Sequence, residues 1–243
     1  MHTGKCCLCL EDKKLIKAHI IPKGLYNLEP AKEPTKLVSN KPNEYPKKAP
    51  VGVYDEGILC AQCDNKIGEW DSYAAVFFKQ EFVEEKYMID NGARLAYVVD
   101  SYDYKSLKLF YMSMLWRAGV SSHGFFEKVD LGSHEAKLRD LLIRGDPGSS
   151  EQFSVIVSKF DYDSSLVPQL NPQRSRYDGL NCYKIYFYGY MSILKVDSRK
   201  YFETLNPYVI KPNEKLVVLL RDYRTSKEFK IMKRLAEKVR FRT

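Results

Sequence analysis

The stretches Cys6-Cys7-Leu8-Cys9 and Cys60-Ala61-Gln62-Cys63 decide how this chain of 243 residues folds. Each stretch contains two cysteines separated by two residues, so both sulfurs of a pair can be presented from one tight turn. Four thiolates in two such pairs match a tetrahedral Zn²⁺ site, which joins two pieces of chain that are far apart in the sequence. The predicted zinc ligands are Cys6, Cys9, Cys60 and Cys63.

The composition favours a folded protein with reduced thiols. The apolar fraction is 44%, and the six cysteines occur without an export signal. Cys7 lacks the two-residue spacing to Cys9 and is expected to be an inert neighbour, and Cys182 is expected to be a buried thiol. The first residues have no apolar core, and no run of about 18 apolar residues predicts a membrane span. We therefore expect a cytoplasmic protein without a membrane anchor.

The charge balance points weakly to a polyanionic partner. The formal net charge is +8, which suits nucleic acid. Many proteins of similar charge bind no nucleic acid, so the charge supports this partner only where it surrounds a site.

Residues 1–90 are expected to form a zinc-bound unit. We predict a short strand within residues 15–21, and a long exposed loop over residues 29–50, where five prolines oppose a central strand or helix. A helix is predicted from Asp64, whose carboxylate is expected to cap it. Its apolar face is expected to carry Ile67, Trp70, Tyr73, Ala74 and Phe77.

Residues 91–243 show a mixed order of helices and strands that predicts the α+β class. The final helix is expected to open with the capping box Thr225-Ser226-Lys227-Glu228 and to turn a basic face to solvent. The stretch 161–178 is predicted to be a loop. Strands are predicted over 95–99, 153–158, 183–188, 192–196 and 215–220, and further helices over 107–119 and 133–144.

The residues between and after the cysteine pairs can form a hydrolytic centre. The imidazole of His19 can take a proton from water near neutral pH. The carboxylate of Asp64 can hold Mg²⁺, which would polarise a scissile phosphate. Lys17, Lys23 and Lys66 are expected to lie close enough to attract phosphates.

At these residues the sequence resembles the HNH endonuclease family, which has a ββα-metal core and frequently a structural zinc. The resemblance rests on the first cysteine pair, on Ala18-His19-Ile20-Ile21-Pro22 and on Ile58 to Lys66, and it covers about the first third of the chain. It implies that His19 is the general base and that Asp64 stands at the place of the helix metal ligand. Asp55 is our choice for the place of the family's middle Asn, with Glu56 as the other candidate.

Two residues depart from the pattern of the family. Ala18 stands where a second metal ligand is usual, and Asp64 replaces the usual His or Asn. Either another carboxylate completes the site or the catalytic metal is weakly held or absent. The candidate carboxylates are Asp55, Glu56, Glu69 and Asp71.

The resemblance implies a Mg²⁺- or Mn²⁺-dependent nuclease that nicks or cuts DNA, in restriction or anti-phage defence, with RNA as a further candidate substrate. Residues 91–243 would select the substrate or a partner protein. One such active centre cuts one strand, so cutting both strands would require a homodimer or two successive binding events. The alternative is a zinc-stabilised module that binds nucleic acid or protein through a degenerate site, and Ala18 favours it. A third, weaker hypothesis is that the cysteines form disulfide bonds.

Overall fold

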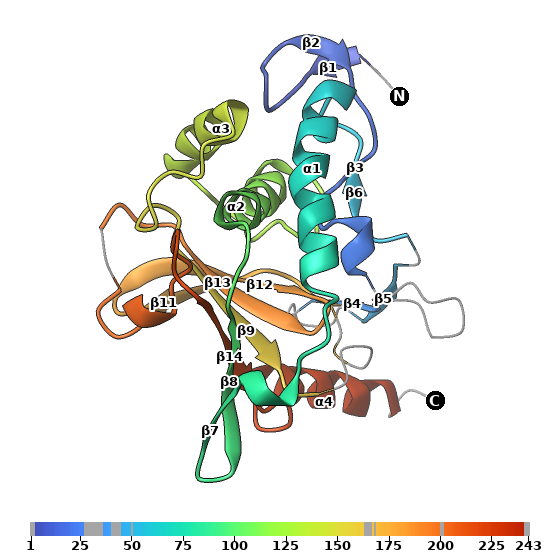
Figure 1. The fold of residues 1–243 in the computed structure, drawn as a ribbon. Helices are drawn as coiled ribbons and strands as arrows, with labels where there is room; N and C mark the ends of the chain where they lie inside the picture. The colour runs from blue at the N-terminus through green and yellow to red at the C-terminus, as the bar shows by residue number, and fades with distance from the viewer. Residues whose placement is uncertain are drawn as a thin grey trace.

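The computed structural model describes residues 3–26, 36–39, 45–49, 51–162, 167, 169–199 and 202–240, without the side chains of residues 235–240. Within these residues the chain has an α+β fold, as predicted (Figure 1). The largest sheet in the described ranges has seven strands, in the order β11-β12-β13-β9-β14-β8-β7. These strands are β7 (Tyr87–Asp90), β8 (Ala93–Val99), β9 (Val155–Phe160), β11 (Gln173–Tyr177), β12 (Leu180–Phe187), β13 (Tyr190–Lys195) and β14 (Leu216–Arg221).

The two faces of this sheet pack against different helices. Along β12, Tyr183, Ile185 and Phe187 join one hydrophobic cluster, and Leu180, Cys182 and Tyr186 join another. This alternation is the period of two that a strand buried on both faces requires. Helices α1 (Ala61–Phe77) and α2 (Tyr104–Val120) cover the first face, and α4 (Lys227–Arg240) covers the other.

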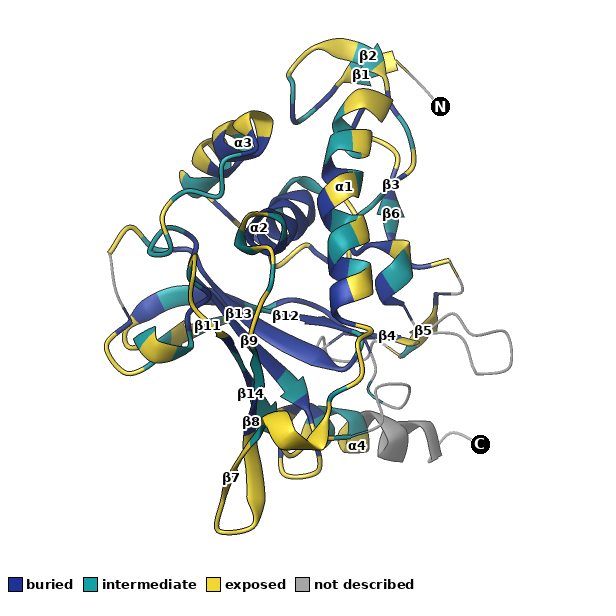
Figure 2. Ribbon diagram, viewed as in Figure 1, coloured by how far each residue is buried: buried dark blue, intermediate teal, exposed yellow. Residues whose placement is uncertain are grey.

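Helix α2 is the central helix of the molecule. Every side chain from Leu107 to Ala118 is buried, and Figure 2 shows the helix enclosed by the other elements. A helix that is apolar on nearly all sides is stable only in such a position. Helix α3 (His134–Arg144) packs against α2 and ends at Gly145, which has a φ of 62°; the predicted helix over 133–144 is confirmed.

The N-terminal elements form small antiparallel units that precede α1. Strands β1 (Thr3–Lys5) and β2 (Asp12–Lys14) make a hairpin, and β3 (Ala18–His19) pairs with β6 (Tyr54–Asp55). One cluster of buried side chains extends from Cys6 to Val218 and therefore joins these elements to the large sheet. The predicted boundary after residue 90 falls in the turn between the paired strands β7 and β8, and the division into two domains stays a prediction.

Both predicted loops contain strands that the sequence reasoning missed. In the described parts of 29–50, β4 (Lys36–Val38) pairs with β5 (Lys47–Lys48) and with β10 (Gln169–Leu170). Within 161–178, β11 pairs with β12 across Asp178 and Gly179, whose φ values of 50° and 73° suit a tight hairpin turn. The other residues of the two loops include 29–35, 40–44, 50, 163–166 and 168, which lie outside the described residues.

Two helix starts differ from the prediction. Helix α1 begins at Ala61 with Cys60 at the N-cap, so Asp64 lies within the first turn and does not cap the helix. At α4 the hydroxyl of Ser226 accepts a hydrogen bond from the backbone N–H of Phe229 (3.0 Å), which makes Ser226, rather than Thr225, the capping residue. The basic residues Lys230, Lys233 and Arg234 lie on α4 as predicted, and the side chain of Lys238 lies outside the described ones.

No helix among the described residues is both long enough and apolar enough to cross a lipid bilayer.

Candidate functional site

The four predicted zinc ligands come together in the structure. The Sγ atoms of Cys6, Cys9, Cys60 and Cys63 all lie within 4.8 Å of one another, and all six cysteines of the chain are free thiols. Cys7 is not a member of this group, as predicted. Four clustered thiols without a disulfide have the ligand number and type of a tetrahedral structural zinc site.

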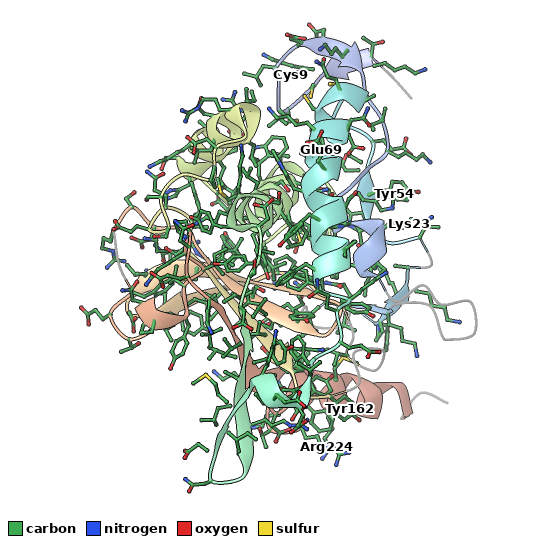
Figure 3. All side chains as sticks on the ribbon, viewed as in Figure 1. Cys9, Lys23, Tyr54, Glu69, Tyr162 and Arg224 are labelled. Carbon is green, nitrogen blue, oxygen red and sulfur yellow. The ribbon has the colours of Figure 1, made fainter. Side chains whose placement is uncertain are left out.

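Backbone geometry prepares this cluster for a metal. The first pair lies in the turn between β1 and β2, where Leu10 has a φ of 61° and its N–H donates to the Cys6 carbonyl (2.9 Å). The second pair lies at the start of α1, next to Cys9 (Figure 3). Burial raises the pKa of the Cys6 thiol, but hydrogen bonds from the backbone N–H groups of Cys9, Cys60 and Leu8 outweigh it and lower the pKa to about 7. Burial raises the pKa of the Cys9 and Cys63 thiols, so of these three ligands only Cys6 is shifted towards the thiolate, the form that binds zinc.

Strands β3 and β6 form a two-stranded antiparallel ribbon whose side chains point to two opposite faces. Ala18 lies opposite Asp55, and His19 lies opposite Tyr54. Directly opposed residues of an antiparallel pair share a face, and the rings of His19 and Tyr54 lie 6.2 Å apart in an edge-on arrangement. Ala18 and Asp55 therefore lie on the face turned away from His19.

His19 lines an open pocket of about 300 Å³ next to α1. Lys23 and Gly24 contribute from the 3₁₀ helix Lys23–Leu25, and Arg117 contributes from α2. A Cβ atom on Gly24 would lie 2.9 Å from the Cβ of Ala75, so glycine is needed for this segment to pack closely against α1. The side chains that α1 contributes are Asp64, Asp71, Ser72 and Ala75, together with Gly68.

The orientation of the His19 ring is fixed by the main chain. Nε2 lies 2.9 Å from the carbonyl oxygen of Val51. A carbonyl oxygen only accepts hydrogen bonds, so Nε2 carries the hydrogen and Nδ1 of the neutral ring keeps its lone pair. The next residue, Gly52, has a φ of 79°, and a Cβ there would overlap the Tyr26 ring. Only glycine fits this backbone position beside Val51.

Arg117 is a site residue that the sequence reasoning missed. Its guanidinium is 1% exposed and makes two 2.8 Å hydrogen bonds to the carboxylate of Asp71. It also donates to the backbone carbonyl of His19 (2.7 Å). One buried side chain of α2 therefore links α1 to the strand that carries His19. The available signal was a charged residue at the end of the largely apolar run from Leu109 to Trp116.

Asp64 and Asp71 are in different chemical situations. The carboxylate of Asp71 is bound by Arg117. Burial raises the pKa of Asp64, Arg117 opposes this shift, and the negative charge of Asp71 adds to it. Among the described residues, the four cysteines are the one group of three or more His, Cys, Asp or Glu side chains whose ligand atoms converge. His19, Asp64 and Asp71 share a pocket without forming such a group.

The other candidate carboxylates lie outside this pocket. Asp55 is buried, and its oxygens accept hydrogen bonds from the backbone N–H groups of Gly57 and Ser122 and from two serine hydroxyls. Glu56 forms a 3.0 Å ion pair with Lys17. Glu69 is exposed on α1 and is not among the described residues that line the pocket (Figure 3). The placement of Asp55 corrects its prediction as a catalytic residue, because its carboxylate ties β6 to the end of α2.

The three predicted phosphate-binding lysines separate in the structure. Lys23 lines the pocket and is exposed, on the side of the molecule that also carries Tyr54 (Figure 3). The ammonium group of Lys17 lies 5.1 Å from the centre of the Tyr54 ring, at the edge of the same region. Lys66 donates to the backbone carbonyl of Ile143 at the end of α3 and is not among the described residues that line the pocket.

We expect Asp55→Asn to lower the free energy of unfolding by about 1–3 kcal/mol, because a buried group loses charge-assisted hydrogen bonds. Burial raises the pKa of Asp55, but the hydrogen bonds from Gly57, Ser121 and Ser122 outweigh it and leave the pKa below its ordinary value. The stabilisation is thus complete above the unfolded pKa of about 4 and is lost as the pH falls through the folded pKa. Urea unfolding at pH 7 and pH 3 measures both effects. An unchanged stability at pH 7 would contradict the structural role.

We expect Arg117→Met to lower the free energy of unfolding by about 3–5 kcal/mol, because it leaves the carboxylate of Asp71 without its buried partner. The matched control is Arg144→Met, which removes an exposed ion pair to Asp140 and should cost less than about 1 kcal/mol. Denaturant titrations of both variants give the comparison. Equal losses of unfolding free energy in the two variants would show that the buried ion pair contributes no more to stability than the exposed one.

Comparison of the chain with protein-family models, with curated proteins and with solved structures finds no match. The functional argument therefore rests on the geometry of the site.

Proposed function

We propose that this protein is a metal-dependent endonuclease of the HNH type that hydrolyses phosphodiester bonds of DNA. The observation that carries the proposal is the fixed imidazole of His19 in the same pocket as Asp64 and Lys23. His19 lies on β3, which pairs with β6, and Asp64 lies on α1, whose start is at the cysteine cluster; Lys23 lies on the 3₁₀ helix that follows β3. The order of β3, β6 and α1 is the one expected of a ββα-metal core.

His19 is suited to act as the general base. The hydrogen bond to Val51 leaves Nδ1 as the ring atom that accepts a proton. Attack by water on a phosphodiester requires that the water lose a proton as it bonds to phosphorus, and a positioned imidazole can accept it. Arg117 holds the backbone of His19 in place through the 2.7 Å bond to its carbonyl oxygen.

Asp64 is the residue that would hold the catalytic Mg²⁺ or Mn²⁺. Mg²⁺ is commonly bound by one or two carboxylates, with waters and substrate phosphate as the other ligands. The single carboxylate of Asp64 in an open pocket fits this pattern, so a second protein ligand at the position of Ala18 is not required. When bound, such an ion would neutralise charge on the scissile phosphate and on the leaving oxygen.

The direct test is conversion of supercoiled plasmid to nicked circles. Purified protein is incubated with plasmid in Mg²⁺ or Mn²⁺, and in parallel without added divalent ion. We expect nicked product in the presence of at least one of the metals. No product in either metal, with a folded protein that contains zinc, would contradict the proposal for the isolated chain.

Lys23→Ala should weaken DNA binding and reduce its salt dependence, because one cation near the scissile phosphate is removed. We expect the slope of log affinity against log salt to fall by about 1. Lys66→Ala is the matched control, since Lys66 is engaged with Ile143. Fluorescence anisotropy with a labelled duplex at several salt concentrations measures both. An equal loss in both variants would contradict the assignment of Lys23 as the phosphate contact.

The second candidate function is a zinc-stabilised binding module with a degenerate catalytic site. Two observations favour it. Ala18, which cannot bind a metal, stands where the family usually has a second metal ligand, and the carboxylate of Asp71 is already hydrogen-bonded to Arg117. This function predicts salt-dependent binding of nucleic acid without turnover in either metal. The plasmid assay and the anisotropy titration together separate the two functions.

A further inference from the structure

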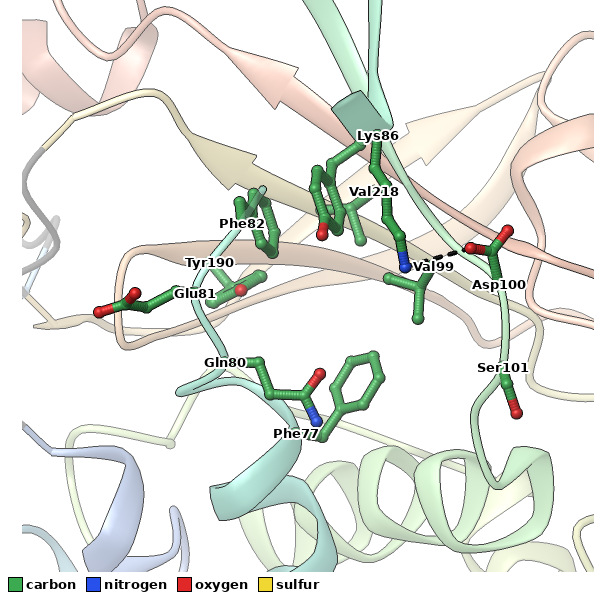
Figure 4. A pocket seen from close by; sticks show the side chains of 11 residues that line it. Phe77, Gln80, Glu81, Phe82, Lys86, Val99, Asp100, Ser101, Tyr190 and Val218 are labelled. Atoms are coloured by element: carbon green, nitrogen blue, oxygen red, sulfur yellow. Dashed lines mark ion pairs between the residues drawn. The ribbon is translucent and has the colours of Figure 1, made fainter. Parts of the chain in front are cut away.

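A second pocket lies between the end of α1 and the large sheet (Figure 4). Phe77, Gln80, Glu81 and Phe82 line it from the α1 side. The other side is lined by Lys86, by the end of β8 and the two residues after it, and by parts of β13 and β14. Its volume is about 210 Å³. Pockets for drug-sized ligands measure about 300–1,000 Å³, so this one suits a single ring or a fused pair of rings.

The inner part of this pocket is aromatic and aliphatic. Phe82 and Tyr97 stack on each other with centroids 3.8 Å apart and planes within 3°. Tyr97 and Tyr190 are buried, and Val218 lies beside them. Such walls favour a flat, apolar ligand body over a flexible or strongly hydrated one.

The rim of the pocket is polar and offers both donors and acceptors. The Gln80 side chain, an amide with both capacities, is exposed at the mouth with Glu81 and Ser101. Lys86 and Asp100 form a 3.1 Å ion pair across the opposite side of the mouth (Figure 4). Asp100 also pairs with Lys215 (2.8 Å), and the ammonium group of Lys159 lies 4.2 Å from the centre of the Phe82 ring, so the two carboxylates of the lining are balanced by nearby ammonium groups.

We propose that this pocket binds a nucleobase. A base has a flat apolar face for the aromatic walls and an edge of donors and acceptors for the polar rim, and it carries no charge. The base can belong to a free nucleoside or to a single strand of nucleic acid. This inference goes beyond the proposed nuclease activity, because the pocket is separate from the one that contains His19.

Helix α1 connects the two pockets. Phe77 at its last turn lines the aromatic pocket, and Asp64 and Asp71 nearer its start line the His19 pocket. A base that fills the aromatic pocket therefore contacts the element that carries the candidate metal ligand.

The test is calorimetric titration of the full-length protein with adenosine, with cytidine and with a single-stranded oligodeoxyadenylate, without added Mg²⁺ or Mn²⁺. The test variant is Phe82→Leu, which keeps an apolar side chain but removes the ring. The matched control is Leu95→Ala, which removes an exposed apolar side chain of β8, the strand that carries Tyr97, outside the pocket lining. A third variant, Lys23→Ala, reports binding through the His19 pocket.

We expect saturable binding that Phe82→Leu weakens about tenfold and that Leu95→Ala leaves unchanged. A loss of oligonucleotide affinity in Lys23→Ala would measure the share of strand binding that comes from the His19 pocket. Binding of adenosine or cytidine would identify a free nucleoside as the ligand; Phe82-dependent binding of the oligonucleotide alone would identify a base of a strand. Absence of binding, or binding that is insensitive to Phe82→Leu while melting curves show both proteins folded, would overturn the proposal. Because no cleavage is measured, these results are independent of the nuclease test.

Discussion

We expect His19→Ala to slow plasmid nicking by about 10²–10⁴-fold, the usual contribution of a positioned general base. The ring is held by Val51 through Nε2, so its loss removes the proton acceptor without removing a core side chain. His19 is partly exposed in its pocket, and its backbone contact with Arg117 is retained in the variant. Initial rates of nicked-circle formation at equal protein and metal concentrations measure the effect.

The control for this variant is His134→Ala, because His134 lies at the start of α3 against Phe153 and outside the His19 pocket. It should nick plasmid at the wild-type rate. Both variants should melt at the wild-type temperature and contain the same amount of zinc. A rate for His19→Ala within threefold of the wild type would eliminate His19 as the base, and equal losses in both variants would point to misfolding.

The largest expected effect on stability comes from the cysteine cluster. We expect Cys60→Ser to lose bound zinc and to lower the melting temperature by about 10 °C or more, since metal binding contributes directly to the stability of such units. Cys60 is the N-cap of α1, its N–H approaches Cys6 Sγ at 3.4 Å, and its backbone bridges to Leu15. Zinc content by elemental analysis and a thermal melt measure the two effects.

Cys7→Ser is the matched control, because Cys7 lies next to the first pair but outside the group of four. It should keep the wild-type zinc content and melting temperature. Wild-type protein treated with a strong chelator should behave like Cys60→Ser. A protein that contains no zinc when purified without chelator, or a Cys60→Ser variant as stable as Cys7→Ser, would contradict the structural role of a metal here.

The features that could be predicted from the sequence are those encoded by local spacing. Two residues between cysteines place both sulfurs on one turn wherever the turn lies, and the four thiols do converge. The 3.6-residue period placed Ile67, Trp70, Ala74 and Phe77 on the buried face of α1. β11 was missed because an edge strand with exposed side chains, such as Arg174 and Arg176, has the composition of a loop.

The tertiary contacts of the site could not be read from local spacing. Asp55 seemed suited to the site from its distance to Cys60, but the register of β3 and β6 turns it away from His19. Lys66 follows Asp64 by two residues, which on a helix places it on another face, and there it reaches α3. Arg117 is far from His19 in the sequence, and only the packing of α2 against α1 brings them together.

The position of Arg117 has a consequence for any shortened form of the protein. A fragment that stopped at residue 90 would keep all four clustered cysteines and His19, yet it would lack the guanidinium that binds Asp71 and the His19 carbonyl. It would also expose the side of α1 that packs on α2. The pocket thus depends on residues from both sides of position 90, and a fragment of residues 1–90 would keep the four clustered thiols while its histidine lost the support of Arg117.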